Sequence, residues 1–390
     1  MKKTLIALAA GAVASTGALA AQVQISGLVD AGLAYNNTDT LWGGTEETFT
    51  EDFGNHLGSR FRFSGSEELA PGYTVSFVLE NGFAGDTGEA SQSGRLFGRE
   101  ARLSLETPYG TISMGRMGSL TSGNGTYDIF QYIGDTFDGG WNYAIDLSNW
   151  FGRSRYDNML TLATPKMAGF TGYFQYSFGT DTVDEDEPSD DATPGDRDKN
   201  RYIGFGLTYE NGPLSSVLVL DSILRKQWND GLAFRQQLDD AMAVSFGIGY
   251  DFDFMKLTFG AQYGKNETQS FFLNDSSIRR FDPTTGRKMD AANDDAYADA
   301  DGYTLGLGAS FPLPCGKLYA AVYYGDVEAN TEIGEKYRNL DIAVGHEYPF
   351  SKRTLSYIGL GYKQAWAKAD GQKFDEERTF TAMVGLQHRF

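Results

Sequence analysis

Apolar and polar residues alternate with a period of two along most of the chain after residue 21, and a helical period is almost absent. A period of two indicates β-strands, because successive side chains of a strand point to opposite faces. The runs are roughly ten to thirteen residues long, which suits strands that cross a membrane at a tilt. We count sixteen of them, at 22–36, 59–69, 73–83, 95–106, 109–116, 155–165, 170–178, 200–210, 213–224, 240–251, 255–264, 302–312, 316–326, 337–348, 354–366 and 378–390.

The connections between these runs alternate between short turns and long polar segments. Turns such as 70–72 and 211–212 alternate with connections such as 37–58, 84–94 and 179–199. Bacterial outer-membrane barrels have this arrangement, with short turns on the periplasmic side and long loops outside. The pattern predicts an all-β protein, a transmembrane antiparallel up-and-down β-barrel of 16 strands, formed by one domain over residues 21–390. Closure leaves no unpaired strand edge in lipid.

One connection, residues 117–154, is unusually long and rich in Gly, aromatic residues and Asp. Its acids are Asp128, Asp135, Asp138 and Asp146, and its only basic residue, Arg153, lies at its end. Structureless connections of this length are usually functional or disordered. Disorder does not suit so many aromatic side chains, which need a surface to pack on. We therefore expect a long acidic loop that folds against another part of the protein.

The alternation also assigns a face to each side chain. In the last strand Phe380, Val384 and Leu386 should face lipid, while Thr381, Met383 and Gln387 face the lumen. An Arg on the lipid face at the middle of the membrane costs about 2–4 kcal/mol. Where a strand contains charged residues, the face that carries them is therefore assigned to the lumen.

By this rule four arginines face the lumen, namely Arg60, Arg62, Arg102 and Arg155. Strict alternation turns Arg99 and Arg116 toward lipid, but both lie near loop ends, where a bulge could turn them inward.

The N-terminal residues 1–20 have the features of a secretory signal peptide. Lys2 and Lys3 precede a short apolar stretch, and Ala18 and Ala20 fit the small-residue pattern of a cleavage site. The apolar stretch is too short to span a membrane as a helix. We expect an exported protein whose mature part begins at Ala21.

Charge and side-chain inventory exclude several classes of function. The formal net charge of −19 argues against nucleic acid as a partner. A single cysteine, Cys315, excludes an intrachain disulfide. The three histidines, His56, His346 and His388, have no persuasive Ser and acid beside them, so an enzyme is not expected. No cofactor motif is present, and we predict no cofactor.

Several stretches resemble the Gram-negative trimeric general porins of proteobacteria. QVQISGLVDAGLAY is similar to their first strand, and SRFRFSGSEELAPGYTVSFVLENGF to the hairpin that follows it. LFGREARLSLETPYGTISMGRM and RSRYDNMLTLATPKMAGFTGYFQY resemble two further hairpins, and the chain ends in Phe390 as theirs do. The likeness covers nearly the whole mature chain and is strongest over residues 21–180.

The resemblance implies localisation in the outer membrane of a Gram-negative bacterium and a homotrimer in which the third long loop folds into each lumen. It further implies contact with outer-membrane lipid and lipopolysaccharide. The strand that ends in Phe390 would be recognised by the barrel-assembly machinery. Small hydrophilic solutes and ions would pass through by passive diffusion.

It also implies a constriction in which loop carboxylates face wall arginines. The loop acids would be Asp128, Asp135, Asp138 and Asp146; the wall would carry Arg60, Arg62, Arg102 and Arg155, with Arg99 and Arg116 as possible additions. Opposed charges across a narrow passage create a transverse field that orients dipolar solutes, and rings of charge set ion preference. The alternative is that these arginines only hold the loop in place through salt bridges.

Other questions stay open at the level of sequence. The acidic run within residues 181–191 either binds divalent cations or is a solvated loop, although its spacing fits no EF-hand. The net charge suggests cation preference, whereas the arginines favour anions. A barrel that serves mainly as an adhesin or scaffold through its long loops is the alternative to a diffusion channel.

Overall fold

The computed structural model describes residues 23–40, 44–138, 140–141, 150–151, 153–181, 200–225, 239–268, 299–330, 335–369 and 371–390. The expected signal peptide, residues 1–20, and Asp146 lie outside the described residues. No described helix is long and apolar enough to cross a membrane.

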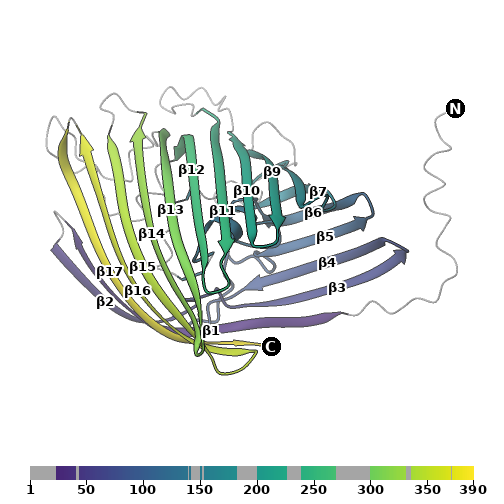
Figure 1. Cartoon of the computed structure of the whole chain (residues 1–390), viewed down its shortest axis with the longest axis horizontal. Helices are drawn as coiled ribbons and strands as arrows, with labels where there is room; N and C mark the ends of the chain where they lie inside the picture. Colours follow the sequence, from purple (N-terminus) through teal and green to yellow (C-terminus); the bar gives the residue numbers. More distant parts are fainter. Residues whose placement is uncertain are drawn as a thin grey trace.

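Almost all regular structure is antiparallel β-strand (Figure 1). The elements are β1 Gln24–Thr40, β2 Gly44–Phe53, β3 Arg60–Ala70, β4 Tyr73–Gly82, β5 Glu100–Thr107, β6 Gly110–Gly118, α1 Phe130–Gly134, β7 Arg155–Ala163, β8 Phe170–Ser177, β9 Arg201–Asn211, β10 Leu214–Leu224, β11 Ala241–Asp251, β12 Lys256–Thr268, β13 Asp299–Leu313, β14 Gly316–Ala329, β15 Lys336–Pro349, β16 Thr354–Ala369 and β17 Gln372–Arg389. Each predicted run overlaps one of these strands.

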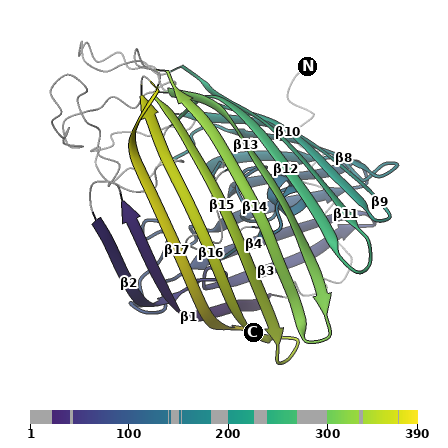
Figure 2. The ribbon, with the colours of Figure 1, turned by 60° about the vertical axis from the view of Figure 1, so that its left-hand side comes forward.

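The sheet closes on itself to form a barrel of sixteen strands, as predicted. Apart from β2 and β3, which both pair with β1, strands that follow one another in sequence pair with each other, and β17 returns to β1, with Leu28 opposite Arg389. The terminal Phe390 and Gly27 exchange two backbone hydrogen bonds of 3.0 Å. The first and last strands are therefore joined up to the last residue, Phe390 (Figure 2).

The second barrel strand is built from two elements, β2 and β3. β2 pairs with Ala31–Thr40 of β1, and β3 pairs with Gln24–Leu28. The expectation of a loop over residues 37–58 was therefore wrong. The sequence GTEETFTEDF mixes Thr and Phe with four acids and is exposed along most of its length, so a pattern of alternating apolar residues did not reveal it as a strand.

Burial along the strands confirms the predicted faces. Val384 and Leu386 of β17 are about half exposed on the outer surface, whereas Thr381, Met383 and Gln387 are buried inside. In β5 the same alternation buries Glu100 and exposes Leu103. The polar face of the sheet thus surrounds the lumen, and the apolar face forms a belt that suits lipid.

The described part of the long connection between β6 and β7 lies inside the barrel, as predicted. Its short helix α1 contacts β10, β11 and β12. Phe130, Ile133, Phe137, Trp141 and Trp150 are all buried against the inner wall. These apolar side chains, four of them aromatic, form a hydrophobic core inside the barrel.

Candidate functional site

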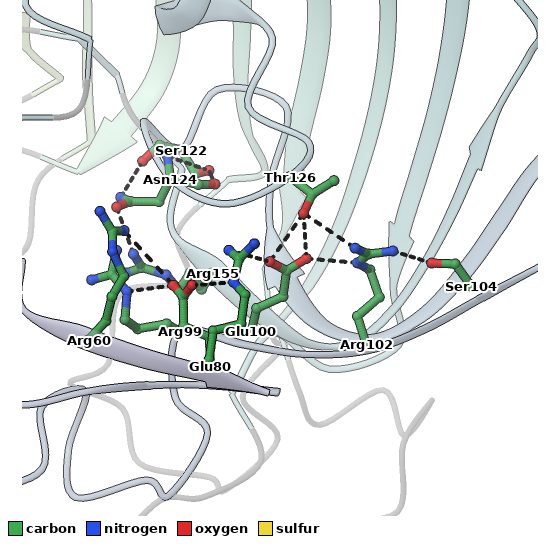
Figure 3. A network of polar contacts seen from close by, with 11 residues as sticks. Arg60, Glu80, Arg99, Glu100, Arg102, Ser104, Ser122, Asn124, Thr126 and Arg155 are labelled. Carbon is green, nitrogen blue, oxygen red and sulfur yellow. Dashed lines mark hydrogen bonds and ion pairs between the residues drawn. The ribbon is translucent and has the colours of Figure 1, made fainter. Parts of the chain in front are cut away.

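Arginines from β3, β5 and β7, and from the residue that precedes β5, converge on one side of the lumen (Figure 3). Arg60 and Arg62 come from β3, Arg102 from β5 and Arg155 from β7, while Arg99 directly precedes β5. We call this group the arginine wall. All of these side chains lie on the inner face of the barrel, which agrees with the parity prediction for Arg60, Arg62, Arg102 and Arg155.

Two glutamates of the same wall hold the guanidinium groups in place. Glu80 of β4 lies 2.7 Å from Arg62 Nε, 2.8 Å from Arg99 Nε and 3.9 Å from Arg60 Nη1. Glu100 lies 2.7 Å from Arg102 Nε and 3.7 Å from Arg62 Nη2. Four guanidinium groups therefore share two carboxylates, and Arg155 adds a fifth cation, so the wall keeps a positive excess. The parity rule turns both Glu80 and Glu100 inward, although neither was among the predicted site residues.

Arg99 and Arg116 both turn inward, against strict alternation. Arg99 precedes the first residue of β5, so the alternation of side chains within that strand does not fix the direction of its side chain. At Arg116 the pairing of β6 with β7 shifts between Gly115 and Met117, which is the bulge that the loop-end position allowed. Arg116 Nη1 then donates to Asp157 at 2.6 Å, so this arginine is paired within the wall.

The loop touches the arginine wall through neutral groups. Arg155 Nη2 donates to the side-chain oxygen of Asn124 at 2.6 Å, and the Thr126 hydroxyl donates to Glu100 at 2.8 Å. Within the described ranges, no wall arginine forms an ion pair with a loop carboxylate. In the described part of the loop, the salt bridges of the alternative, in which these arginines only hold the loop in place, are therefore not seen.

A cavity of about 700 Å³ separates the arginine wall from the loop. Arg60, Arg99 and Arg155 line one side of it, and Asp128 and Asp138 line the loop side. We call it the arginine cavity. It has charges of opposite sign on facing sides, which is the arrangement that creates a transverse field.

The two loop acids of this cavity hold their protons more tightly than usual. Burial raises the pKa of Asp128 well above its usual value, and the nearby Asp138 raises it further. Loss of hydration inside the lumen and the neighbouring Asp135 raise the pKa of Asp138 to about 6, although its side chain keeps an exposed surface. Asp138 therefore changes charge within the range of pH that a bacterial surface meets.

Asp135 has a different position from the one expected. Its carboxylate accepts hydrogen bonds from Trp150 Nε1 at 3.0 Å, from the hydroxyl of Tyr323 in β14 and from the Phe137 backbone N–H at 3.1 Å. These contacts lie on the wall opposite the arginines. Asp135 thus fastens the loop to the barrel and does not line the arginine cavity.

The end of the loop is fastened by a buried ion cluster. Arg153 Nε lies 2.6 Å from Asp221 of β10, and its two terminal nitrogens lie 2.6 and 2.7 Å from Glu267 of β12. Burial acts to lower the pKa of Arg153, but the two carboxylates outweigh burial and raise it above its usual value. The sequence showed Arg153 as the lone basic residue of an acidic loop, and this signal could have marked it as an anchor.

The opposite wall is lined by glycines, which make room for the loop. A Cβ added to Gly247 would come within 2.9 Å of the Gly134 Cα, and one added to Gly260 or Gly306 would come within 2.8 Å of the Trp150 ring. A Cβ at Gly345 would lie 2.8 Å from the Trp141 ring. We call Gly247, Gly260, Gly306 and Gly345, in β11, β12, β13 and β15, the glycine wall.

Among the described residues, no group of three His, Cys, Asp or Glu side chains is arranged to hold a metal ion. The acidic run within 181–191 lies outside the described residues apart from Asp181.

A sequence profile described as Gram-negative porin matches residues 5–366. An outer membrane porin protein of Bordetella pertussis is 31% identical to this chain over 417 residues, and both chains are covered completely. Outer membrane porin protein 32 of Delftia acidovorans is 33% identical over 409 residues, again with complete coverage of both. Among solved structures, an anion-selective porin from Comamonas acidovorans superposes with a TM-score of 0.65 and 23% identity, covering 95% of this chain and 100% of that one.

Proposed function

The chain belongs to the family of Gram-negative porins and forms a channel in the outer membrane, and on this premise we propose that ions and small hydrophilic solutes pass through the arginine cavity. One observation carries the proposal. Arg60, Arg99 and Arg155 face Asp128 and Asp138 across a cavity of about 700 Å³, without ion pairs between the two groups in the described part of the chain. Because these cations and carboxylates do not pair with each other across the cavity, they can interact with a solute that passes between them.

We propose that this constriction favours anions. The arginine wall carries more guanidinium groups than carboxylates, and burial raises the pKa of Asp128, which disfavours negative charge on the loop side. The overall charge of −19 does not decide the matter, because a charge outside the narrow passage is screened beyond about 10 Å at 0.1 M salt. The Comamonas porin, which is described as anion-selective, fits this direction.

We further propose a homotrimer, as the resemblance to trimeric porins implies. Recognition of the Phe390 strand by the barrel-assembly machinery and contact with lipopolysaccharide belong to the same proposal. The apolar outer belt, with exposed side chains such as Leu220, Phe246 and Leu305, supports contact with lipid.

Single-channel recording of refolded protein in planar bilayers tests the proposal. We expect a stable conductance that closes in three equal steps, and a reversal potential in a salt gradient that shows anion preference. Correct folding is checked by the altered electrophoretic mobility of unheated barrel. Folded protein without conductance would contradict the channel and favour a scaffold that acts through its long loops. A reversal potential of cation sign would contradict the role given to the arginine wall.

A further inference from the structure

A second cavity, of about 350 Å³, lies at the end of the barrel where short turns join the strands. Three basic residues line it. Lys256 is the first residue of β12, Lys317 is the second residue of β14, and Arg389 is the last residue of β17. They come from three strands that are distant in sequence, and the closed sheet brings them to one end of the lumen. We call this the lysine cavity.

The parity of each strand points these side chains inward. Thr258, Tyr319 and Gln387 are buried residues of the inner face, and each lies two positions from one of the three basic residues. The lysine cavity is therefore part of the solute path and not of the lipid-facing surface. By the usual orientation of bacterial barrels, short turns face the periplasm.

The three cations have no carboxylate partner within 4.0 Å in the part of the chain that the structure describes. Lys256 Nζ lies 6.0 Å from the centre of the Tyr132 ring, and Lys317 Nζ lies 4.7 Å from that of Tyr319. Arg389 Nε donates to the neutral side-chain oxygen of Gln387 at 3.1 Å. Their capacity to bind a negatively charged group is thus largely unused.

Two of the three acids that line the lysine cavity are paired with or hydrogen-bonded to residues other than these three cations. Glu347 lies 3.0 Å from His56 Nε2, and Asp135 accepts the hydrogen bonds from Trp150 and Tyr323 described above. Asp138 is the exception, and it lines both the lysine cavity and the arginine cavity. A solute that leaves the arginine wall therefore passes this carboxylate before it meets the next group of cations.

We propose that the lysine cavity is a second anion-binding site, which takes small oxyanions with two or more negative charges, such as inorganic phosphate or a short dicarboxylate. Two ammonium groups offer three donors each, and Arg389 adds a guanidinium fork, so several oxygens of one anion can be bound at once. A monovalent ion such as chloride has a single acceptor atom, so it can form fewer charge-assisted hydrogen bonds and should bind more weakly. The inference rests on the proposed function, because it assumes that anions reach this end of the channel.

The test measures how inorganic phosphate reduces the chloride current through single channels. We expect wild-type channels to be blocked more strongly when phosphate is added on the short-turn side. In the variant Lys256→Gln/Lys317→Gln the half-blocking concentration should rise at least about tenfold, as expected when charge-assisted hydrogen bonds to the anion are lost. The matched control is Lys166→Gln/Lys352→Gln, which removes two exposed lysines from turns at the same end of the barrel but outside the cavity. It should be blocked like wild type.

Three outcomes would overturn the inference: no phosphate block in wild type, an unchanged block in the cavity variant, or a block that disappears only in Arg60→Gln/Arg99→Gln, which would place the anion in the arginine cavity. If the double variant does not fold, Lys317→Gln carries the test, because this side chain is largely exposed. Calorimetric titration of detergent-refolded protein with phosphate measures binding without current. It separates failure of this inference from failure of conduction, which would contradict the proposed function instead.

Discussion

The two sides of the lumen differ in what their inward residues allow. The arginine wall carries long charged side chains that Glu80 and Glu100 hold in position, and a cavity of about 700 Å³ remains in front of it. The glycine wall has no side chains at its contact points, and the loop packs directly on it with Gly134, Trp141 and Trp150. The loop therefore fills one side of the barrel and leaves the passage against the other.

This difference shows how the barrel places its opening. Glycine lets another backbone or an aromatic ring approach closely, and burial of those rings is favourable. Guanidinium groups that share only two carboxylates would lose hydration if an apolar loop covered them, which is unfavourable. The lumen in front of the arginine wall therefore stays open to water. The composition of the two walls decides where the loop rests, and the cations consequently border the solute path.

The largest expected effect comes from removing the charge that fastens the loop. Arg153→Met leaves Asp221 and Glu267 buried without a cation, which typically costs about 3–5 kcal/mol. We expect the free energy of unfolding to fall by roughly that amount. Guanidinium-induced unfolding of the refolded protein in detergent measures it.

The matched control for this variant removes all three charges. Arg153→Met/Asp221→Asn/Glu267→Gln should recover more than half of the lost free energy, because no uncompensated charge stays buried. Equal stability of Arg153→Met and wild type would show that the ion cluster does not fasten the loop to β10 and β12.

A smaller effect is expected from filling the glycine wall. Gly247→Val adds a side chain where the Gly134 Cα already lies 2.9 Å from the position of a Cβ. Overpacking of this kind typically costs about 1–3 kcal/mol. The loop should move toward the arginines, so single-channel conductance should fall.

Gly172→Val in β8 is the control for the glycine wall. A Cβ there meets its nearest neighbour at 3.5 Å, which is ordinary contact. If both valine variants conduct like wild type, the glycine wall does not set the position of the loop.

The barrel could be predicted from the sequence more completely than the site. Period-two alternation fixes which face of β5 or β17 is buried, because one face meets lipid and the other water. It also placed Arg60, Arg62, Arg102 and Arg155 in the lumen. The inward or outward direction of a side chain depends only on its own strand, so the alternation of apolar and polar residues is enough to predict it.

The sequence could not predict which residues meet across the lumen. Asp128 and Asp135 look alike as loop acids, yet one lines the arginine cavity and the other binds Tyr323, which lies 188 positions further along the chain. The bulge that turns Arg116 inward combines a register shift in the pairing of β6 with β7 and a positive φ of 130° at Gly115, and only the glycine is visible in the sequence. Contacts between distant segments form only when the sheet closes into a barrel, so they cannot be predicted from the residues of one strand or loop alone.

The arginine wall should control ion preference more strongly than stability. A unit charge about 10 Å from a passing ion contributes about 0.4 kcal/mol in water before screening. Arg60→Gln/Arg99→Gln removes two such charges, so the ratio of anion to cation permeability should fall several-fold. Reversal potentials in a salt gradient measure it, with Lys166→Gln/Lys352→Gln as the control of equal charge. An unchanged ratio would mean that the passage does not run along the arginines.

The smallest expected effect is the titration of a single carboxylate on the loop side. Because the pKa of Asp138 is raised to about 6, the group is neutral at pH 5 and charged at pH 8. Raising the pH therefore adds one negative charge between the arginine and lysine cavities, and anion preference should decrease through pH 6 by about half the effect of the double arginine variant. Asp138→Asn should remove the step near pH 6, while the separate titration of Asp128, whose pKa is also raised, persists. Reversal potentials recorded across this range measure the step, and a step of the same size in Asp138→Asn would assign it to another group.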